Sequence, residues 1–198
     1  MKLVENMVRN YTDLEIINRI RGLKSFKGFP LQRYIVGIRS NDDITNKYDD
    51  KFYIFEGERF ITMTTGTTNP GAPILEAGFL KYNKVGAAVV KSNECYYDLW
   101  QHGYHMGKME ALRQVNPIIV YRDGDRDGKS EEIGTPISGL YGINFHTNDY
   151  NKFSKEIKTN IGNWSAGCQV VNDCEKYYQL IPTFRVQKFV TYFLLQEF

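Results

Sequence analysis

A cysteine and an upstream histidine are the residues of this chain whose types and spacing best suit covalent chemistry. Cys168 lies in residues 164–170 (WSAGCQV), 22 residues after His146, which ends residues 142–146 (GINFH). A thiolate is a strong nucleophile, an imidazole can take the thiol proton, and peptide N–H groups near the sulfur can receive an oxyanion. Gly167 suits this last role because a residue without a Cβ allows close approach. The alternative is a small buried cysteine in a turn and a hydrogen-bonded core histidine.

The same residues resemble the active-site signature of the L,D-transpeptidase catalytic domain, the YkuD-like family. That family carries a histidine, a variable interval and then Ser/Thr-x-Gly-Cys, which matches His146 and residues 165–168. Residues 52–66 resemble the early hairpin of the family, so the resemblance spans about residues 50–175. The interval of 22 residues is slightly long for the family, and residues 1–50 have no counterpart.

The resemblance implies an acyl-enzyme mechanism on peptidoglycan stem peptides. His146 takes the proton of Cys168, the thiolate attacks a carbonyl beside a D-centre, and amides around Gly167 and Cys168 hold the oxyanion. The family orients its histidine through the backbone carbonyl of the next residue, which is Thr147 here. Asn144 is a second supporting candidate. Water or an amine then releases the acyl group, giving hydrolysis or cross-linking.

Five residues are expected to contact the substrate. They are Trp164, Ser165, Asn144, His105 and Tyr104. The last two belong to residues 96–108, a block rich in aromatic and histidine side chains, interpreted as one wall of the substrate groove; the alternative is a packed aromatic cluster. The loop of residues 67–73 either lies near the cleft, as in the family, or is a plain connector.

Two positions depart from the family pattern. The family usually places His, Arg or Asn at the position of Ala166, and a polar Arg or Asn at the position of Val170. These side chains help to set substrate and acceptor recognition, so donor specificity stays open, with Gln169 and Asn172 as candidate substitutes. The departures favour a runner-up hypothesis, a non-catalytic peptidoglycan-binding module that is virion-associated.

One acidic loop resembles the first half of a calcium site. Asp123, Asp125 and Asp127 alternate before Gly128, and such oxygens can converge on a hard cation. The bidentate position six residues later is Gly134, so the second half is missing. The alternative is a solvated acidic hairpin turn.

A second metal pattern is weaker. His102 and His105 are three residues apart, close enough to meet on a helical turn, and with Cys95 they could be zinc ligands of a metallopeptidase. No second close ligand pair completes a recognisable spacing. The sequence therefore indicates no cofactor.

Composition narrows the function classes. The formal charge of +2 over 198 residues is too balanced to indicate nucleic-acid binding. No stretch is apolar enough to span a membrane, residues 1–6 lack a secretory pattern, and three cysteines do not indicate a disulfide framework. We therefore expect synthesis in the cytoplasm without a signal peptide and action at the cell wall, as in a phage-type endolysin. This context favours a murein peptidase over a resident L,D-transpeptidase.

The predicted fold is a single α+β domain over residues 1–198, with a mainly antiparallel, sandwich-like sheet and N-terminal helical material packed on it. Residues 1–50 form an N-terminal helix and strand extension. A helix is expected over residues 12–24, capped by Thr12, with Leu14, Ile17 and Ile20 on its apolar face. Strands are expected at residues 34–38, in a hairpin at 52–65 that turns at 56–58, and at 85–90, 116–121 and 137–145. Residues 184–198 are a closing strand or helix.

Overall fold

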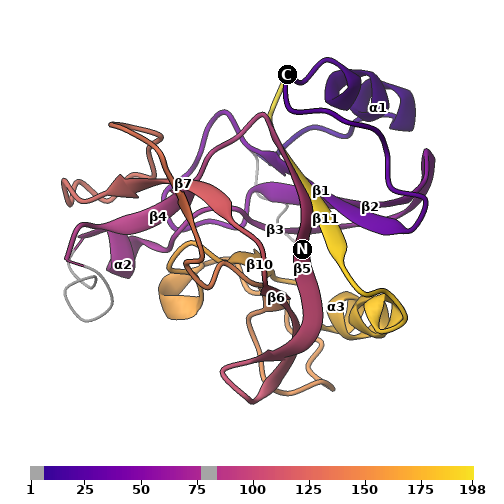
Figure 1. Ribbon diagram of the computed structural model, residues 1–198. Coiled ribbons are helices and arrows are strands. Elements are labelled where there is room, and N and C mark those ends of the chain that lie inside the picture. The colour runs from indigo at the N-terminus through magenta and orange to yellow at the C-terminus, as the bar shows by residue number, and fades with distance from the viewer. Residues whose placement is uncertain (1–6, 77–83) are drawn as a thin grey trace.

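The fold is α+β and mostly β, as the sequence predicts. A computed structural model describes residues 7–76 and 84–198 (Figure 1). The N-terminal residues 1–6 lie outside the described residues. The elements in chain order are α1 (Asp13–Arg21), β1 (Arg33–Arg39), β2 (Asp50–Glu56), β3 (Arg59–Thr67), α2 (Ala72–Glu76), β4 (Ala87–Val90), β5 (Glu94–His105), β6 (Met109–Gln114), β7 (Ile118–Asp123), β8 (Ile137–Gly139), β9 (Phe145–Thr147), η2 (Gly162–Trp164), β10 (Gln169–Val171), α3 (Cys174–Leu180), η3 (Ile181–Phe184) and β11 (Val190–Gln196).

Eight strands close into a barrel. Their order is β1-β11-β5-β6-β9-β10-β3-β2, and the pairing of β2 with β1 completes the ring. The pairs β1/β11 and β9/β10 are parallel, and the other neighbouring pairs are antiparallel. The mainly antiparallel character is confirmed, but the sandwich arrangement is not, because the main sheet closes on itself. β1 comes from the segment expected to be an extension and is part of this ring.

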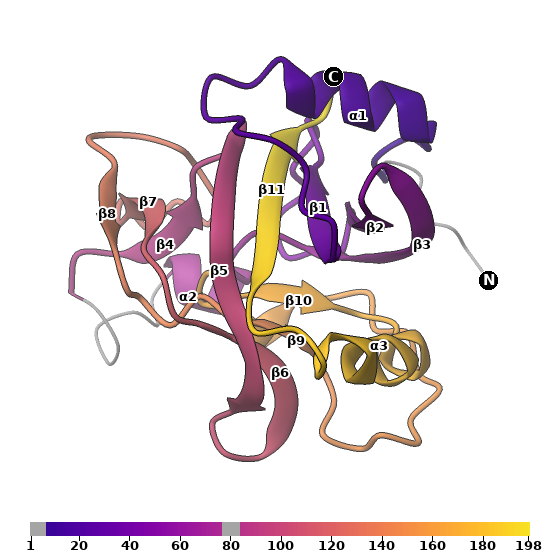
Figure 2. The same ribbon diagram turned by 45° about the vertical axis from the view of Figure 1, so that its right-hand side comes forward.

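A second sheet lies beside the barrel. It contains three antiparallel strands in the order β4-β7-β8. Figure 2 shows this sheet to one side of the long strand β5, with β11 beside β5 on the other side. The small sheet carries Ala88, which contacts the cysteine-containing turn described below.

The first helix covers the outer face of the barrel. Thr12 caps α1 in a capping box with Glu15, which satisfies backbone groups at the helix start. The helix buries Ile16, Ile17 and Ile20 in one apolar cluster with alternate side chains of β1, β2 and β11. The prediction that Leu14 lies on the buried face was wrong. Leu14 is 65% exposed, and the buried face of the helix contains Ile16 instead.

The barrel interior holds a second apolar cluster. Trp100, Phe145, Tyr192 and Phe52 meet there, with ring centroids 4.7–5.8 Å apart. β1 is therefore buried on both faces: Ile35 belongs to the interior cluster and its neighbours to the cluster under α1. The sequence of a strand that is buried on both faces is a nearly continuous run of apolar residues. For this reason β1 was predictable from the sequence.

Two expectations about local structure are corrected. Residues 96–105 form an extended strand, so His102 and His105, at an odd spacing, lie on opposite faces and do not meet on a helical turn. Residues 137–145 form no single strand, since β8 ends at Gly139 and β9 begins at Phe145. Gly142, at a φ of +73°, bends the chain between them.

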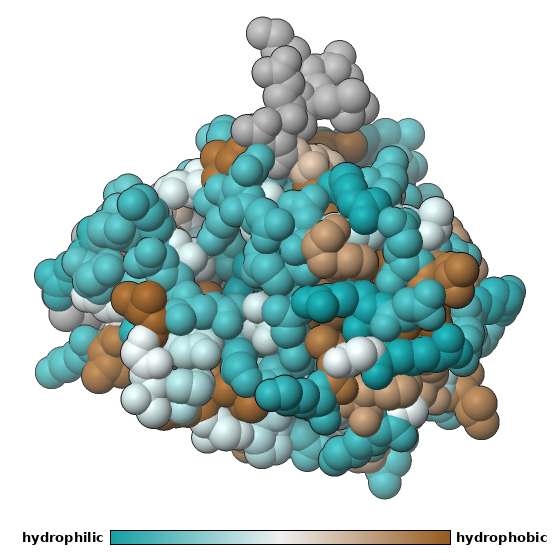
Figure 3. Space-filling model, turned by 90° about the horizontal axis from the view of Figure 1, so that it is seen from above, coloured by the Kyte–Doolittle hydropathy of each residue, from teal (hydrophilic) through white to brown (hydrophobic). Residues whose placement is uncertain are grey.

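In the described part of the chain, no helix combines the length and apolar composition needed to cross a membrane. Figure 3 shows the face that bears α1 as mostly hydrophilic, with apolar residues in small separate groups. Apolar groups scattered in this way are ordinary on a protein surface.

Candidate active site

Two parallel strands bring the cysteine and the histidine together. His146 is the central residue of β9 and pairs with Val170 of β10. Cys168 immediately precedes β10. Residues separated by 22 positions in sequence thus come to the same end of neighbouring strands. One ring nitrogen each of His105 and His146 and the sulfur of Cys168 all lie within 4.8 Å of one another.

The hydrogen bond of His146 selects its tautomer. Nδ1 lies 2.7 Å from the carbonyl oxygen of Thr147, and a carbonyl oxygen can only accept a hydrogen bond. Nδ1 therefore carries the proton, and Nε2 is left with a bare lone pair. Nε2 is buried and has no hydrogen-bond partner among the described residues. Burial, together with the neighbouring His105, lowers the pKa of His146 to about 3, so the imidazole is neutral at physiological pH.

The thiol of Cys168 is neutral in the resting site as well. Its sulfur is partly exposed and lies 3.5 Å from the amide nitrogen of Asn144 and 3.5 Å from the carbonyl oxygen of Gly142. Loss of hydration raises the pKa of Cys168 to about 11, although the Asn144 amide opposes that rise. The low pKa of His146 and the high pKa of Cys168 both disfavour a resting ion pair of thiolate and imidazolium. A reaction at this site needs proton transfer during attack on the substrate.

A serine and a glycine shape the turn that presents Cys168. The Ser165 hydroxyl donates to the Cys168 carbonyl at 2.8 Å and accepts from the Gly167 amide at 3.2 Å. Gly167 has a φ of +129°, and a Cβ there would lie 2.5 Å from the Ala88 carbonyl oxygen. Ser165 is fully buried, so its place in the structure is that of a turn-forming residue. The Gly167 amide is engaged in this turn and is not free for an oxyanion.

Asn144 connects the groups around the sulfur. Its backbone amide faces Cys168, and its carbonyl oxygen accepts from the Gln169 amide at 2.8 Å. Its side-chain oxygen accepts a hydrogen bond from the backbone N–H of Gln114 at 2.9 Å, which fixes the orientation of the Asn144 carboxamide. The side-chain nitrogen therefore points to His105 Nδ1, 3.0 Å away. Asn144 was predicted as a supporting residue, and the structure places it at the centre of this network.

His105 stacks on His146. The two ring centroids are 4.2 Å apart with an interplanar angle of 20°. Since Asn144 donates to Nδ1, the neutral His105 ring carries its proton on Nε2. Burial lowers the pKa of His105, so two neutral imidazoles lie side by side.

Gln114, at the end of β6, was missed by sequence reasoning. Its side-chain oxygen accepts from the amides of Tyr141 and Ile143, and its side-chain nitrogen donates to the carbonyls of Asn116 and Gly139. Three of these four bonds, those with Gly139, Tyr141 and Ile143, hold the segment that leads to Asn144. A lone glutamine at a strand end has no sequence signal for this role.

Tyr104 and Trp164, two other residues expected to contact the substrate, differ in their position relative to Cys168. Tyr104 precedes His105 in β5 and lies on the opposite face of that strand, 6.5 Å between ring centroids from His102. Trp164 contacts Tyr150, with ring centroids 5.4 Å apart, and packs with Cys168 on one apolar cluster. Trp164 is thus next to the cysteine turn, whereas Tyr104 is not directed to the Cys168 side of β5.

Gln169 and Asn172 are the candidate substitutes for the polar side chains that the family has at positions 166 and 170. Both form hydrogen bonds within the protein. Gln169 is buried, accepts from the Tyr192 hydroxyl at 2.6 Å and donates to the Thr68 and Gly167 carbonyls. Asn172 accepts from the Thr65 hydroxyl and donates to the Lys158 carbonyl.

The loop of residues 67–73 lies beside the cysteine turn. The Gly71 amide donates to the Ser165 carbonyl at 3.0 Å. The expectation that this loop lies near the reacting residues is therefore supported by its position.

The acidic loop gathers three carboxylates that differ in part from those expected. Oxygens of Asp125, Asp127 and Glu131 lie within 4.8 Å of one another, whereas Asp123 accepts from the Glu131 amide at 2.9 Å. Asp127 also pairs with Lys129 at 3.7 Å. This exposed cluster is compatible with a solvated turn, and calcium binding stays a prediction.

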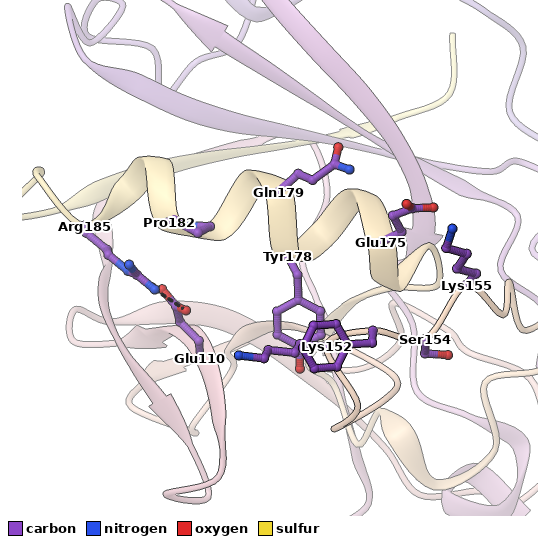
Figure 4. A pocket seen from close by; sticks show the side chains of 10 residues that line it. Glu110, Lys152, Ser154, Lys155, Glu175, Tyr178, Gln179, Pro182 and Arg185 are labelled. Atoms are coloured by element: carbon purple, nitrogen blue, oxygen red, sulfur yellow. Dashed lines mark hydrogen bonds and ion pairs between the residues drawn. The ribbon is translucent and has the colours of Figure 1, made fainter.

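His102 contacts a residue that lines a separate charged hollow. Its Nε2 lies 2.7 Å from Glu110, which also pairs with Arg185. Figure 4 shows the Glu110–Arg185 pair at one end of a hollow of about 550 Å³ that is further lined by residues of α3 and of the 152–155 loop. This hollow contains no cysteine or histidine, so it offers no nucleophile of the predicted type.

Comparisons with known proteins gave no match. No family model, no curated protein and no solved structure matches the chain. The functional assignment rests on the residues and their geometry.

Proposed function

We propose that this protein is a cysteine-dependent peptidase of the peptidoglycan stem peptide, with Cys168 as nucleophile and His146 as base. The observation that carries the proposal is the hydrogen bond from His146 Nδ1 to the Thr147 carbonyl. It leaves Nε2 as a buried, unpartnered acceptor on a ring whose nitrogen lies within 4.8 Å of the thiol sulfur. A core histidine would usually have both nitrogens satisfied.

The mechanism begins from a neutral pair. As the Cys168 sulfur attacks the substrate carbonyl carbon, its proton passes to His146 Nε2, and a C–S bond forms while the carbonyl becomes an oxyanion. Because the Gly167 amide is bound to Ser165, we assign the oxyanion to the Cys168 amide. His146 then returns the proton to the leaving amine. Water attacks the acyl-enzyme and regenerates the thiol.

The substrate class comes from the sequence resemblance. The Ser165-x-Gly167-Cys168 pattern after His146 resembles that of enzymes with a YkuD-like fold, and we propose this fold type for the barrel as well. The contact between the Thr147 carbonyl and the imidazole supports the orienting role that the resemblance implies, and the contact of the Asn144 amide with the sulfur supports the separate choice of Asn144. The acyl-enzyme would be shared by hydrolysis and transpeptidation, and the acceptor decides between them.

A non-catalytic peptidoglycan-binding module is the second candidate. The observation in its favour is the raised pKa of Cys168, about 11, which leaves almost no thiolate at neutral pH. Buried Gln169 and the apolar Val170 also leave few polar groups for an acceptor.

The test is mass spectrometry of muropeptides released from purified peptidoglycan by the wild type, Cys168→Ala and His146→Gln. New peptide ends that appear only with the wild type support the peptidase, and new cross-links identify a transpeptidase. Digests identical to untreated wall across several wall types, in a protein that still sediments with the wall, would replace the enzyme with the binding module. Cys95→Ala is a matched control, since Cys95 lies away from the site, beside Ser25.

A further inference from the structure

The ligand atoms around Cys168 have the composition of a zinc site. Thiolate sulfur and neutral imidazole nitrogen are the ligands that Zn²⁺ prefers, and open sites use three protein ligands with water in the fourth position. His105, His146 and Cys168 offer one such atom each, all within 4.8 Å of one another. They come from the end of β5, from β9 and from the turn before β10.

A buried, unpartnered nitrogen is the second observation. His146 is 1% exposed, and its Nε2 has no hydrogen-bond partner within the described ranges 7–76 and 84–198. Its Nδ1 is already fixed by the Thr147 carbonyl, as the outer nitrogen of a metal-bound histidine usually is. The histidine thus has the tautomer and the backbone partner of a metal ligand as well as those of a base.

We propose that His105, His146 and Cys168 bind one Zn²⁺ ion, and that zinc and substrate compete for the Cys168 sulfur. Binding replaces the thiol S–H bond with a Zn–S bond, releases that proton to solvent and displaces zinc-bound water. Zn–S and Zn–N bonds of about 2.3 and 2.0 Å in a tetrahedral site place the ligand atoms about 3.5 Å apart, so the three atoms must move closer together when the metal binds. The stacked rings of His105 and His146 must also tilt relative to each other, because an imidazole lone pair lies in the plane of its ring. His105 gives up its hydrogen bond with Asn144 if the metal takes Nδ1.

Zinc binding and its inhibitory effect are separable claims. The binding follows from the ligand set alone, whereas the competition with substrate rests on the proposed peptidase function. An occupied site holds the sulfur as a metal-bound thiolate that cannot attack a carbonyl. Chelation then restores the free thiol.

The first experiment is calorimetric titration of the chelator-treated, full-length protein with Zn²⁺ alone. We expect one equivalent to bind and about one proton to be released near neutral pH, read from the dependence of the heat on buffer ionisation. Zinc binds cysteine as the thiolate and histidine as the neutral imidazole, so Cys168 is the source of that proton. Co²⁺ should give a sulfur-to-metal charge-transfer band.

Variants locate the metal. His105→Gln should weaken zinc binding at least about tenfold, and Cys168→Ser should abolish the charge-transfer band. Asp127→Asn, in the exposed acidic loop, should leave both unchanged. Zinc that binds equally to wild type, His105→Gln and Cys168→Ser, or that is lost in Asp127→Asn, would overturn the proposal. If a variant fails to fold, protection of wild-type Cys168 from alkylation by one equivalent of Zn²⁺ decides the question.

The two proposals fail independently. A protein that binds zinc at Cys168 but releases no muropeptides after chelation keeps the metal site and loses the peptidase. A protein that cleaves peptidoglycan and is indifferent to Zn²⁺ keeps the peptidase and loses the metal site.

Discussion

At the scale of single residues, the protonation states of His146 and Cys168 define how the site can work. The pKa of the His146 imidazole is lowered to about 3, and the pKa of the Cys168 thiol is raised to about 11. Both shifts have burial as their largest cause, because burial disfavours the charged form of each group. Both groups are therefore neutral in the resting site. In the proposed mechanism, the thiol proton moves to His146 only as the sulfur attacks a substrate carbonyl.

The pH dependence of alkylation tests this description. We expect the rate of Cys168 modification by iodoacetamide to rise about tenfold per pH unit from pH 7 to 10, because the thiolate fraction grows toward the pKa of about 11. Peptide mapping by mass spectrometry separates Cys168 from Cys95 and Cys174. A rate plateau between pH 5 and 8, lost in His146→Gln, would instead reveal an imidazolium–thiolate pair.

Removal of the base should act on catalysis more than on the resting thiol. His146→Gln is expected to lower muropeptide release by about 10²–10⁴-fold, the usual contribution of a positioned base. The alkylation rate at pH 9 should change little, since the resting thiol does not depend on an imidazolium. Equal release by His146→Gln and wild type would remove His146 from the mechanism.

At the scale of elements, the site is held by a turn and by the segment between β8 and β9. The turn depends on Gly167, which lies against the Ala88 carbonyl of β4. The segment depends on Gln114, whose side chain bonds to Gly139, Tyr141 and Ile143. These residues touch no substrate in the proposed mechanism, yet they place the groups that do.

Gly167→Ala should disrupt the cysteine turn. A Cβ at this position meets backbone 2.5 Å away at a φ of +129°, which a side chain rarely adopts. We expect a loss of about 3 kcal/mol in the free energy of unfolding, measured by urea denaturation, and loss of activity. Gly57→Ala is the matched control, because Gly57 also has a positive φ, +60°, but nothing lies within 4 Å of its Cβ position. The control should lose only about 1 kcal/mol. Equal losses would show that the contact with Ala88 does not matter.

Gln114→Glu should loosen the segment that leads to Asn144. The carboxylate keeps the length of the side chain and its acceptor oxygen but cannot donate to the Asn116 and Gly139 carbonyls. We expect muropeptide release to fall at least about tenfold through lost positioning of the reacting groups. Hydrogen exchange at Tyr141 and Ile143 should quicken in Gln114→Ala, which also removes the oxygen that accepts from both amides. Normal exchange together with lost activity would assign Gln114 a different role.

At the scale of the whole molecule, the fold buries two adjacent carboxyl groups, those of Asp49 and Asp50, in addition to its apolar clusters. Asp50 accepts from the Ser40 and Thr68 amides at 2.7 and 2.6 Å, and Asp49 accepts from the Ile44 amide at 2.8 Å. Burial and, for Asp49, the adjacent charge of Asp50 raise the pKa of both carboxyls above the usual value of 3.8. Asp50 begins β2 and Asp49 immediately precedes it, and their hydrogen bonds hold the loop before the strand.

This arrangement predicts how stability changes with pH. A carboxyl whose pKa is raised by folding binds more protons in the folded state, so its contribution is present below pH 3.8 and is lost as pH rises through the raised value. Asp49→Asn should therefore flatten the decline in unfolding free energy above pH 4, measured by urea denaturation at a series of pH values. Asp42→Asn, at an exposed neighbour, is the control and should keep the wild-type slope. Parallel curves for wild type and Asp49→Asn would contradict the prediction.

The amino-acid sequence determined the local features of this protein. Apolar runs and turn residues predicted β1, the β2–β3 hairpin, β7 and the α+β class, because side-chain periodicity and backbone preference act over a few residues. The Thr12 cap and the start of α1 followed from the same local rules. The pattern Ser165-x-Gly167-Cys168 after His146 selected Cys168 and His146 as the candidate reacting groups, because residue type limits chemistry before any fold is known.

Only the tertiary structure decided what surrounds that pair. Closure of the barrel depends on the pairing of β1 with β11 and β2, contacts between residues far apart in sequence. The strand geometry of β5 turned His105 toward His146 and Tyr104 away, and Gln114 acquired its role from bonds that no local pattern encodes. Protonation state, tautomer and the grouping of Cys168 with two imidazoles depend on burial and long-range contacts, so they emerge only when the chain has folded.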